Sequence, residues 1–373
     1  MADTQKLIRH RLHALCPYFA MFPPEFVRRF VEEYSKRGDL ILDPFSGRGT
    51  TLLESLLLGR RAIAADINPV AYCVSAAKAN TPQLDDVLAE LDGLEWMYLR
   101  RYYDPPVKPA LPEFFEYAFH PDTLSQLLSL KTNLNWKRKR DHRFIAALVL
   151  GHLHGEADRS EYYFSNQMPH SISTKPDYSV RYWRAHNMIP PQRDVFDILR
   201  NRAEFRLKMG RPEIWGHAAL CDVRDVARVF PEQCNQVRMV LTSPPYLDVT
   251  NFEEDQWLRL WFLGGPPHPT YGQISKDDRR AGATGYWEFI RSAWRGVVPL
   301  LRNRAILICR IGAKNIEPEL LMRRFIDVVT SVWPKNQMIA RPSISEVKHS
   351  QISVLNPKAS GCRYEMDFEC AVR

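Results

Sequence analysis

The 373-residue sequence has no apolar run long enough to cross a membrane and no cysteine pattern that would hold a metal. A membrane-spanning helix needs roughly eighteen consecutive apolar residues. The N-terminus carries arginines and histidines without the long apolar core of a secretory signal. The seven cysteines are scattered and include no C-x-x-C pair. These absences predict reduced thiols, a cytoplasmic setting and no metal.

Length and charge limit the classes of protein that remain. A chain of 373 residues that is 45% hydrophobic is long enough for one large α/β domain with an insertion, or for two domains. The net charge of +8 and the sequence pI near 9.1 fit a polyanionic partner. Charge alone does not distinguish such a protein from a basic cytosolic protein without a nucleic-acid partner.

Residues 40–51 show the pattern of a buried strand, a tight turn and a helix. Leu40 to Leu42 are apolar, Asp43 ends the run, Gly47 and Gly49 follow, and helical spacing begins at Thr51. Glycines let the backbone approach a ligand closely, and the free amides of a helix start point toward it. This stretch therefore predicts a nucleotide-binding turn.

A second predicted strand, residues 62–66, ends in Asp66 about twenty residues after the turn, where doubly wound folds bind ribose hydroxyls. Asn68 and Pro69 then open a helix. A pyrophosphate-binding turn would carry a third glycine, which is missing, and Asp43 would repel a phosphate. The pattern favours adenosine with a cationic substituent over NAD.

The sequences D-P-F-S-G-R-G-T-T at 43–51 and T-S-P-P-Y at 242–246 together resemble the DNA amino-methyltransferases that use S-adenosylmethionine. The serine form of the second motif resembles the cytosine-N4 branch, since adenine-N6 enzymes more often carry aspartate or asparagine there. The resemblance implies an α/β fold, a Rossmann-like seven-stranded methyltransferase sheet with a mostly helical insertion, and S-adenosylmethionine as cofactor.

The resemblance also implies roles for individual residues. Asp66 would bind ribose, Asp222 the adenine amino group, and Gly47 and Gly49 the methionine part. Phe45 and Tyr246 would flank the reacting groups. The implied catalytic residues are Ser243, Pro244, Pro245 and Tyr246, and the implied cofactor-binding residues are Asp43, Phe45, Gly47, Gly49, Thr50, Asp66, Ile67, Asp222, Val223 and Thr242.

The chemistry of an aromatic amine explains the residue types of the second motif. Cytosine N4 is a poor nucleophile because its lone pair is delocalised into the ring, and acceptors that hold its hydrogens favour the pyramidal transition state. The Ser243 hydroxyl and the Ser243 or Pro244 carbonyl can supply these acceptors, and the two prolines stiffen the turn. Tyr246 would stack on a base flipped out of the duplex.

Residues 83–209 read as a mostly helical insertion and the candidate target-recognition region, whereas 1–82 and 210–373 form the catalytic domain. Lys137, Arg138, Lys139 and Arg140 are a candidate phosphate clamp, although a solvated helix end fits equally well. Residues 162–184 are predicted to be an ordered loop, in which Tyr182, Trp183 and Arg184 contact DNA or pack on the catalytic domain. The loop after Tyr246 and the tail 341–363 are alternatives, and the loop 264–285, with Lys276, Arg279 and Arg280, is a candidate lid or DNA-facing strip.

Further elements complete the expected sheet. Predicted helices cover residues 26–34, 194–207, 252–263, 287–301 and 320–329, and predicted strands cover residues 214–222, 239–242, 305–309, 337–340 and 366–372. The aromatic and proline-rich stretch 16–24 resembles the family segment that packs over the methionine end of the cofactor. It could also be part of an N-terminal helix that covers the sheet edge.

The function predicted from these patterns is transfer of a methyl group from S-adenosylmethionine to cytosine N4 in a specific duplex DNA sequence. A restriction–modification setting, in a prokaryote or phage, would add a cognate restriction endonuclease as partner, and the enzyme would be a monomer or homodimer. The alternatives are adenine-N6 methylation of DNA, methylation of an RNA base, and a non-catalytic DNA-binding subunit.

Overall fold

A computed structural model describes residues 9–18, 22–101, 111–157, 160–169, 174–246, 252–270, 282–313, 315–346 and 362–372. Its centre is one mixed sheet with the strand order β3-β2-β1-β4-β5-β8-β6, and β7 also pairs with β8. The strands are β1 (Leu40–Asp43), β2 (Arg61–Asp66), β3 (His217–Leu220), β4 (Val237–Thr242), β5 (Leu301–Ala313), β6 (Gln337–Met338), β7 (Ser343–Glu346) and β8 (Tyr364–Val372).

The sheet is doubly wound and Rossmann-like, as the sequence predicted. Strands β1 to β5 pair in parallel, and β8 runs antiparallel to β5. The order reverses between β1 and β4, which creates the crevice at the carboxyl ends of the strands where such sheets bind ligands. Of the seven strand positions, the last is shared by β6 and the unpredicted β7, which pair with different parts of β8.

Helices cover both faces of the sheet, which explains why β1 is buried along its whole length. Leu40 and Leu42 face α13 (Gly282–Val297) and α14 (Pro318–Val332) in one apolar cluster. Ile41, which points the other way, packs with Phe30 of α1 (Pro24–Tyr34). The same side carries α2 (Thr50–Leu57) and α3 (Pro69–Ala79).

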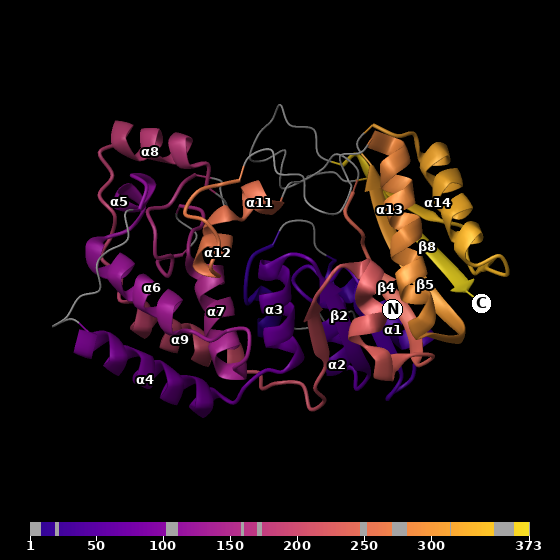
Figure 1. The fold of residues 1–373 in the computed structure, drawn as a ribbon, viewed down its shortest axis with the longest axis horizontal. Coiled ribbons are helices and arrows are strands. Elements are labelled where there is room, and N and C mark those ends of the chain that lie inside the picture. The colour runs from indigo at the N-terminus through magenta and orange to yellow at the C-terminus, as the bar shows by residue number, and fades with distance from the viewer. Residues whose placement is uncertain are drawn as a thin grey trace, which may run out of the picture.

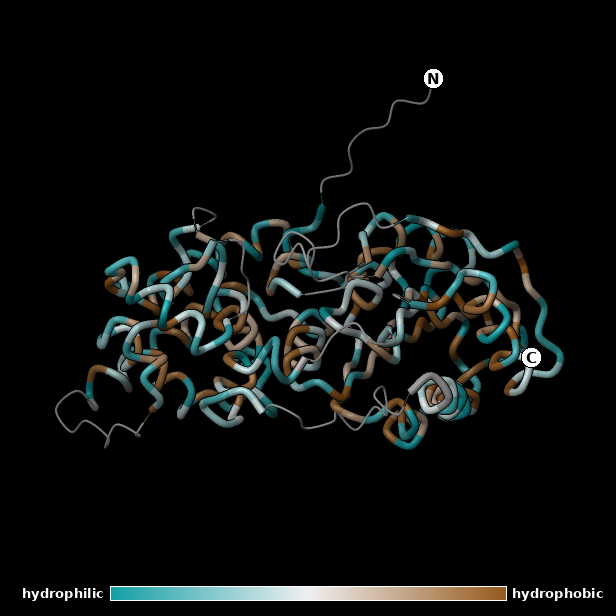
Figure 2. The backbone as a smooth tube through the Cα atoms, turned by 90° about the horizontal axis from the view of Figure 1, so that it is seen from above, coloured by the Kyte–Doolittle hydropathy of each residue, from teal (hydrophilic) through white to brown (hydrophobic). Residues whose placement is uncertain are grey.

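A helical lobe lies at the other end of the molecule from β8, at the left of Figure 1. It contains α4 (Leu84–Arg101), α5 (Phe114–Ala118), α6 (Pro121–Asn133), α7 (Arg140–His152), α8 (Pro176–Ala185) and α9 (Val195–Leu207). Figure 2 shows the lobe and the sheet lying end to end. The helical content agrees with the prediction for this stretch. Among the described residues, no helix combines the length and apolarity that a membrane crossing requires.

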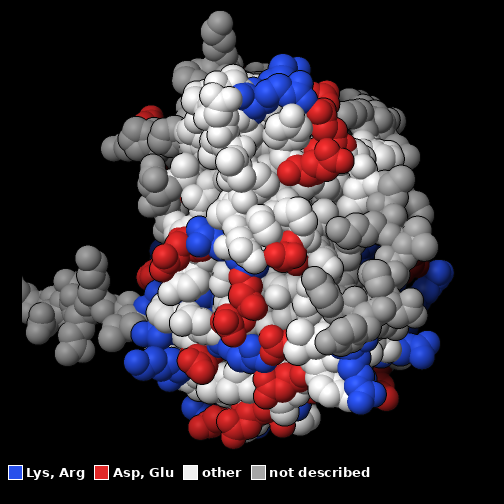
Figure 3. All heavy atoms as spheres, turned by 90° about the vertical axis from the view of Figure 1, so that its left-hand side faces the viewer, with Lys and Arg blue, Asp and Glu red and all other residues white. Residues whose placement is uncertain are grey.

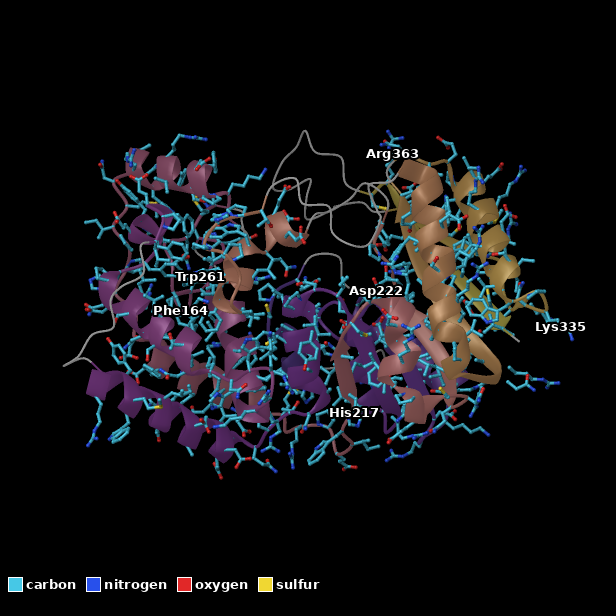
Figure 4. All side chains as sticks on the ribbon, in the orientation of Figure 1. Phe164, His217, Asp222, Trp261, Lys335 and Arg363 are labelled. Carbon is cyan, nitrogen blue, oxygen red and sulfur yellow. The ribbon has the colours of Figure 1, made fainter. Side chains whose placement is uncertain are left out.

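The core of the helical lobe includes residues from outside the predicted insertion. Val70 and Val74 of α3 belong to it, and so do Trp257 and Trp261 of α12 (Trp257–Phe262). Figure 1 shows α12 beside α7, and Figure 4 shows Trp261 among the lobe's side chains. The chain therefore returns to the lobe after β4. The 3-10 helix η1 (Arg11–Ala14) also contributes Leu12 to this core.

Two local predictions were wrong. Residues 176–185, predicted as loop, form α8 because Pro176 occupies the first turn and Val180 and Trp183 pack into the lobe. The single helix expected over 252–263 is divided into α11 (Phe252–Asp255) and α12. The remaining short elements are η2 (Val223–Asp225), α10 (Val226–Val229), η3 (Pro231–Gln233) and η4 (Val298–Leu300).

Candidate active site

The glycine turn joins β1 to α2 through two residues with left-handed backbone angles. Gly47 has φ of +48° and Gly49 has φ of +74°. A Cβ atom on Gly49 would lie 2.9 Å from Cβ of Ser75 on α3, so only glycine lets the start of α2 pack this closely. Gly49 thus serves helix packing, whereas Gly47 faces a pocket.

The carboxylate of Asp66 ties the glycine turn to the end of β2. Its Oδ2 accepts the backbone N–H of Gly47 at 2.8 Å, and its Oδ1 accepts that of Asn68 at 2.9 Å. Asn68 in turn caps α3 by accepting the Val70 N–H. Because these bonds fix its orientation, Asp66 presents a half-exposed carboxylate at the carboxyl edge of the sheet.

The two sequence motifs meet at one pocket at this edge. The pocket encloses about 440 Å³, including space open to solvent. Asp43, Phe45, Gly47 and Thr50 line it from the first motif, and Ser243 and Tyr246 line it from the second. Strands β1 and β4 are neighbours, so residues about 200 positions apart in sequence lie side by side: the Thr242 hydroxyl donates to Oδ1 of Asp43 at 2.6 Å.

Burial raises the pKa of Asp43 to about 6, against the hydrogen bonds from Thr242 and the Phe45 N–H that favour the charged form. The side chain is only 3% exposed. A buried carboxylate without a salt bridge is costly. A cation bound in the pocket would offset that cost, and this matches a sulfonium or ammonium group better than a phosphate.

Tyr246 is held against the sheet by a chain of polar contacts. Ser243 Oγ donates to the Arg310 carbonyl at 3.1 Å and lies 3.2 Å from the Tyr246 hydroxyl, which donates to Glu365 at 3.0 Å. Burial, and then the charge of Glu365, raise the pKa of Tyr246 well above its usual value. The ring lies on Gly312, where a Cβ atom would come within 2.7 Å of it.

Arg310 closes the far wall of the pocket and is fully paired. Its guanidinium binds Asp367 through two hydrogen bonds of 2.6 and 2.9 Å and Glu365 at 3.1 Å. Its Cζ lies 3.9 Å from the ring centre of Phe26. Sequence reasoning did not single out Arg310, Glu365 and the lining residues Ser46 and Arg48. Phe22, which also lines the pocket, belongs to the stretch 16–24 that was expected to pack over the cofactor. The antiparallel register, which sets Arg310 opposite Asp367, would have been needed to find Arg310 and Glu365.

The predicted adenine-binding residues lie at the ends of β2 and β3, and not among those that line this pocket. Asp222 follows β3, and Figure 4 places it beyond the carboxyl end of this strand, whereas His217 lies at the other end of the strand. Both of its carboxylate oxygens accept from Arg224, at 3.0 and 2.7 Å. Val223 is buried, and Ile67 is half-buried beside Asp66. Pro244 is buried and Pro245 half-buried.

The cations predicted to clamp phosphate are mostly paired within the lobe. Arg140 contacts Asp86 at 2.8 Å and Asp141 at 3.1 Å, and Lys139 lies 3.8 Å from Glu90. Lys137 lies over the ring of Trp136 at 5.5 Å, and Arg138 is exposed. Figure 3 shows acidic and basic side chains interspersed on the end of the lobe, so its described surface has no continuous basic patch there.

Of the aromatic residues predicted to contact DNA, Trp183 is completely buried, and its indole N–H donates to the Gln167 carbonyl at 3.1 Å. This placement removes Trp183 from the candidates. Tyr182 packs against His186 with ring centres 4.1 Å apart, and Arg184 pairs with Glu113 at 2.5 Å. The loop cations Lys276, Arg279 and Arg280 lie outside the described residues.

Comparison with known proteins agrees with the first of the two motifs at the site. Residues 3–77, which contain β1, the glycine turn and β2, match the model of a family described as DNA methylase. Residues 3–77 are therefore similar to the amino-methyltransferases of DNA, and the match does not distinguish the cytosine-N4 branch from the adenine-N6 branch.

Three curated relatives are named type II methyltransferases. M.MjaII of Methanocaldococcus jannaschii is 36% identical over 75 residues, M.BsoBI of Geobacillus stearothermophilus 35% over 86, and M.MvaI of Kocuria varians 27% over 139. These matches cover 20%, 21% and 35% of this chain and 14%, 17% and 30% of the respective relatives. The chain therefore matches less than a third of each relative.

Solved structures overlap with the chain only loosely. The rRNA methyltransferase aviRa from Streptomyces viridochromogenes is 15% identical, with a TM-score of 0.35 over 98% of this chain and 94% of that one. M. jannaschii TYW2 in complex with AdoMet is 9% identical, with a TM-score of 0.33 over 95% and 79%. The fold assignment rests on the strand order and not on these overlaps.

Proposed function

We propose that this protein methylates an exocyclic amine of DNA, with cytosine N4 as the target. The observation that carries the proposal is the pocket in which Asp43, Phe45 and Gly47 of the first motif face Ser243 and Tyr246 of the second. The matched family, described as DNA methylase, supports DNA as the substrate, and the relatives' names support methyl transfer. The serine of the second motif favours cytosine over adenine. A restriction–modification setting with a cognate endonuclease is part of the same proposal.

The residues present fit S-adenosylmethionine as the methyl donor. When bound, the cofactor supplies an electrophilic methyl group on a sulfonium. The buried Asp43 carboxylate would offset positive charge in the pocket, and Gly47 leaves room for close approach of the backbone. Asp66 would hold the ribose hydroxyls, while Ile67, Asp222 and Val223 would surround the adenine, because they follow β2 and β3 along the same edge.

Ser243 would prepare the amine for attack. Its hydroxyl hydrogen is directed to the Arg310 carbonyl, so the oxygen lone pairs can accept the amine hydrogens. This arrangement favours the pyramidal nitrogen, on which positive charge develops during in-line transfer. The amine then loses one proton, and the carboxylates of Asp43 and Glu365 line the pocket as acceptors. The Tyr246 ring would stack on the flipped base.

The test is methylation of duplex DNA by the purified chain with labelled S-adenosylmethionine, followed by digestion to nucleosides and mass measurement. The proposal expects N4-methylcytosine. N6-methyladenine would leave the reaction class standing and replace the target base. Label in total RNA but not in duplex DNA would contradict the proposal. Cofactor binding without transfer to any nucleic acid would indicate a non-catalytic subunit.

A further inference from the structure

Three arginines from two elements surround one aromatic ring on the helical lobe. The Cζ atoms of Arg11, Arg202 and Arg206 lie 4.1, 4.5 and 5.4 Å from the ring centre of Phe205. Arg202 and Arg206 are four residues apart on α9 and share one helix face, and Arg11 comes from η1. We refer to these four residues as the Phe205 cluster. Phe205 itself is 40% exposed.

The positive charges of the Phe205 cluster are not neutralised within the described part of the chain. None of its three guanidinium groups forms an ion pair there. The Nε atoms of Arg202 and Arg206 are buried without a hydrogen-bond partner. Arg11 donates to the Phe205 carbonyl at 3.2 Å, and Arg202 lies over the Tyr162 ring at 4.6 Å. Neither contact supplies negative charge.

Like charges at this spacing repel one another. Burial and then the neighbouring Arg202 lower the pKa of Arg206 to about 10. Burial, together with the charge of Arg11, also lowers the pKa of Arg202. An anion placed between the guanidinium groups would relieve this repulsion and satisfy the orphan N–H groups. The planar forks of arginine suit phosphate oxygens in particular.

The Phe205 cluster lies within reach of the candidate active site along the nucleic acid. Arg11 and Tyr18 are seven positions apart in the chain, which limits the separation of their Cα atoms to about 25 Å. The Tyr18 ring lies 3.6 Å from the position of a Cβ on Gly47. With a rise of about 3.4 Å per base pair, this distance corresponds to roughly seven base pairs of duplex. A duplex longer than about seven base pairs is therefore long enough to reach from one place to the other.

We propose that Arg11, Arg202 and Arg206 bind backbone phosphates of the duplex DNA substrate, with Phe205 holding the guanidinium groups in place. The inference rests on the proposed function for the identity of the nucleic acid. It assigns phosphate binding to residues other than the Lys137 to Arg140 run, whose members Lys139 and Arg140 already pair with acidic side chains.

The experiment measures binding of the full chain to a fluorescein-labelled 30-base-pair duplex by anisotropy, across a series of salt concentrations and without cofactor. Arg202→Gln/Arg206→Gln should lower the slope of log affinity against log salt by about 1 to 2, because each phosphate contact contributes about 0.9. Between 1 M and 0.1 M salt, this change of slope weakens the affinity of the variant for the duplex, relative to that of the wild type, by roughly 8-fold to 60-fold.

Two variants serve as controls. Arg202→Lys/Arg206→Lys keeps the charge and should keep most of the salt slope. Lys139→Gln/Arg140→Gln removes the same number of charges from the paired run and should leave the slope unchanged. Arg11→Gln, on a separate element, should lower the slope by about 1 even if the α9 double variant proves unstable.

A wild-type slope in both the α9 double variant and Arg11→Gln would overturn the proposal, and so would an equal loss in the Lys139/Arg140 variant. Calorimetry with S-adenosylmethionine separates this outcome from failure of the proposed function. Wild-type cofactor binding and transfer with unchanged slopes would refute only the phosphate site. Slopes that fall as expected in a chain that transfers no methyl group would refute only the enzymatic assignment.

Discussion

Arginine serves different purposes in two regions of the molecule. At the pocket, Arg310 has two carboxylate partners and an aromatic ring beneath it, and the same contacts hold Glu365 and, through it, Tyr246. In the Phe205 cluster, three guanidinium groups share a ring and have no carboxylate partner among the described residues. A paired arginine fixes its neighbours, whereas an unpaired group attracts an anion from outside. The salt slopes described above test the unpaired arginines of the Phe205 cluster, and the following predictions test the pocket around Arg310.

The largest effect is expected from Ser243→Ala. Removing an acceptor directed at developing charge should reduce turnover by about 100-fold to 1,000-fold. Cofactor affinity, measured by calorimetry, should change by less than about threefold, because Ser243 would face the amine and not the ribose. The salt slope of duplex binding should match that of the wild type. A loss of cofactor affinity equal to the loss of turnover would contradict this role.

Asp66→Ala should have the opposite signature. The change leaves the N–H groups of Gly47 and Asn68 without their acceptor and removes the group proposed to bind ribose. Hydrogen bonds to a charged group contribute about 1.5–3 kcal/mol, so the cofactor Kd should rise by roughly 10-fold to 100-fold. Turnover at saturating cofactor should fall far less. Asp66→Asn, which keeps one acceptor oxygen, is the matched variant and should lie between.

Asp43→Asn tests the electrostatics of the pocket through pH. The pKa of Asp43 in the folded protein, about 6, lies above the ordinary aspartate value of 3.8, so its burial costs stability progressively as pH rises from about 4 to 6. The difference in melting temperature between Asp43→Asn and the wild type should therefore be more favourable to the variant at pH 8 than at pH 5. Its carbonyl oxygen can still accept from Thr242 and Phe45.

The same variant should lose the pH dependence of cofactor binding. In the wild type, affinity should weaken by up to about tenfold as pH falls from 7.5 to 5, because protonation removes the charge that attracts the cation. Titrations at both pH values would measure it. If the affinity for the cofactor changed equally with pH in the wild type and in Asp43→Asn, Asp43 would not face the cationic part of the cofactor.

The smallest effect is expected from the bond between Tyr246 and Glu365. Tyr246→Phe keeps the ring and removes only its hydrogen bond to the Glu365 carboxylate, which does not touch the reacting amine, so turnover should fall by about threefold to tenfold. Glu365→Gln should then add little in the Tyr246→Phe background, which a double-mutant cycle would measure. Strict additivity of the two changes would show that Glu365 acts on something other than Tyr246.

The sheet could be predicted from the sequence because each of its main strands carries a local signal. Continuous apolar runs ending in Asp43, Asp66 and Thr242 coincide with β1, β2 and β4, and Asn68-Pro69 marks the start of α3. These signals depend on backbone period and caps within a few residues. The strand order was not predicted, because it depends on which distant segments of the chain pair.

The remaining wall of the pocket could not be predicted, because it depends on contacts between distant segments. Glu365 reaches the pocket only because β8 pairs antiparallel with β5, which sets Glu365 opposite Gly312. The burial of Trp183 was missed for a related reason: α8 has only ten residues, and its apolar side packs on α5 and not on a neighbour in sequence. The Phe205 cluster likewise joins residues almost 200 positions apart.

The path of the chain through α12 limits how the helical lobe could be exchanged between proteins. After Tyr246 the chain crosses to the helical lobe, where Trp257 and Trp261 complete its core, before returning to the sheet through α13. A chimera that transplanted only residues 84–207 would give both tryptophans foreign neighbours. A chimera that preserves this core must also include α12 from the same protein. The lobe therefore consists of two separate segments of the chain and cannot be exchanged as one continuous segment.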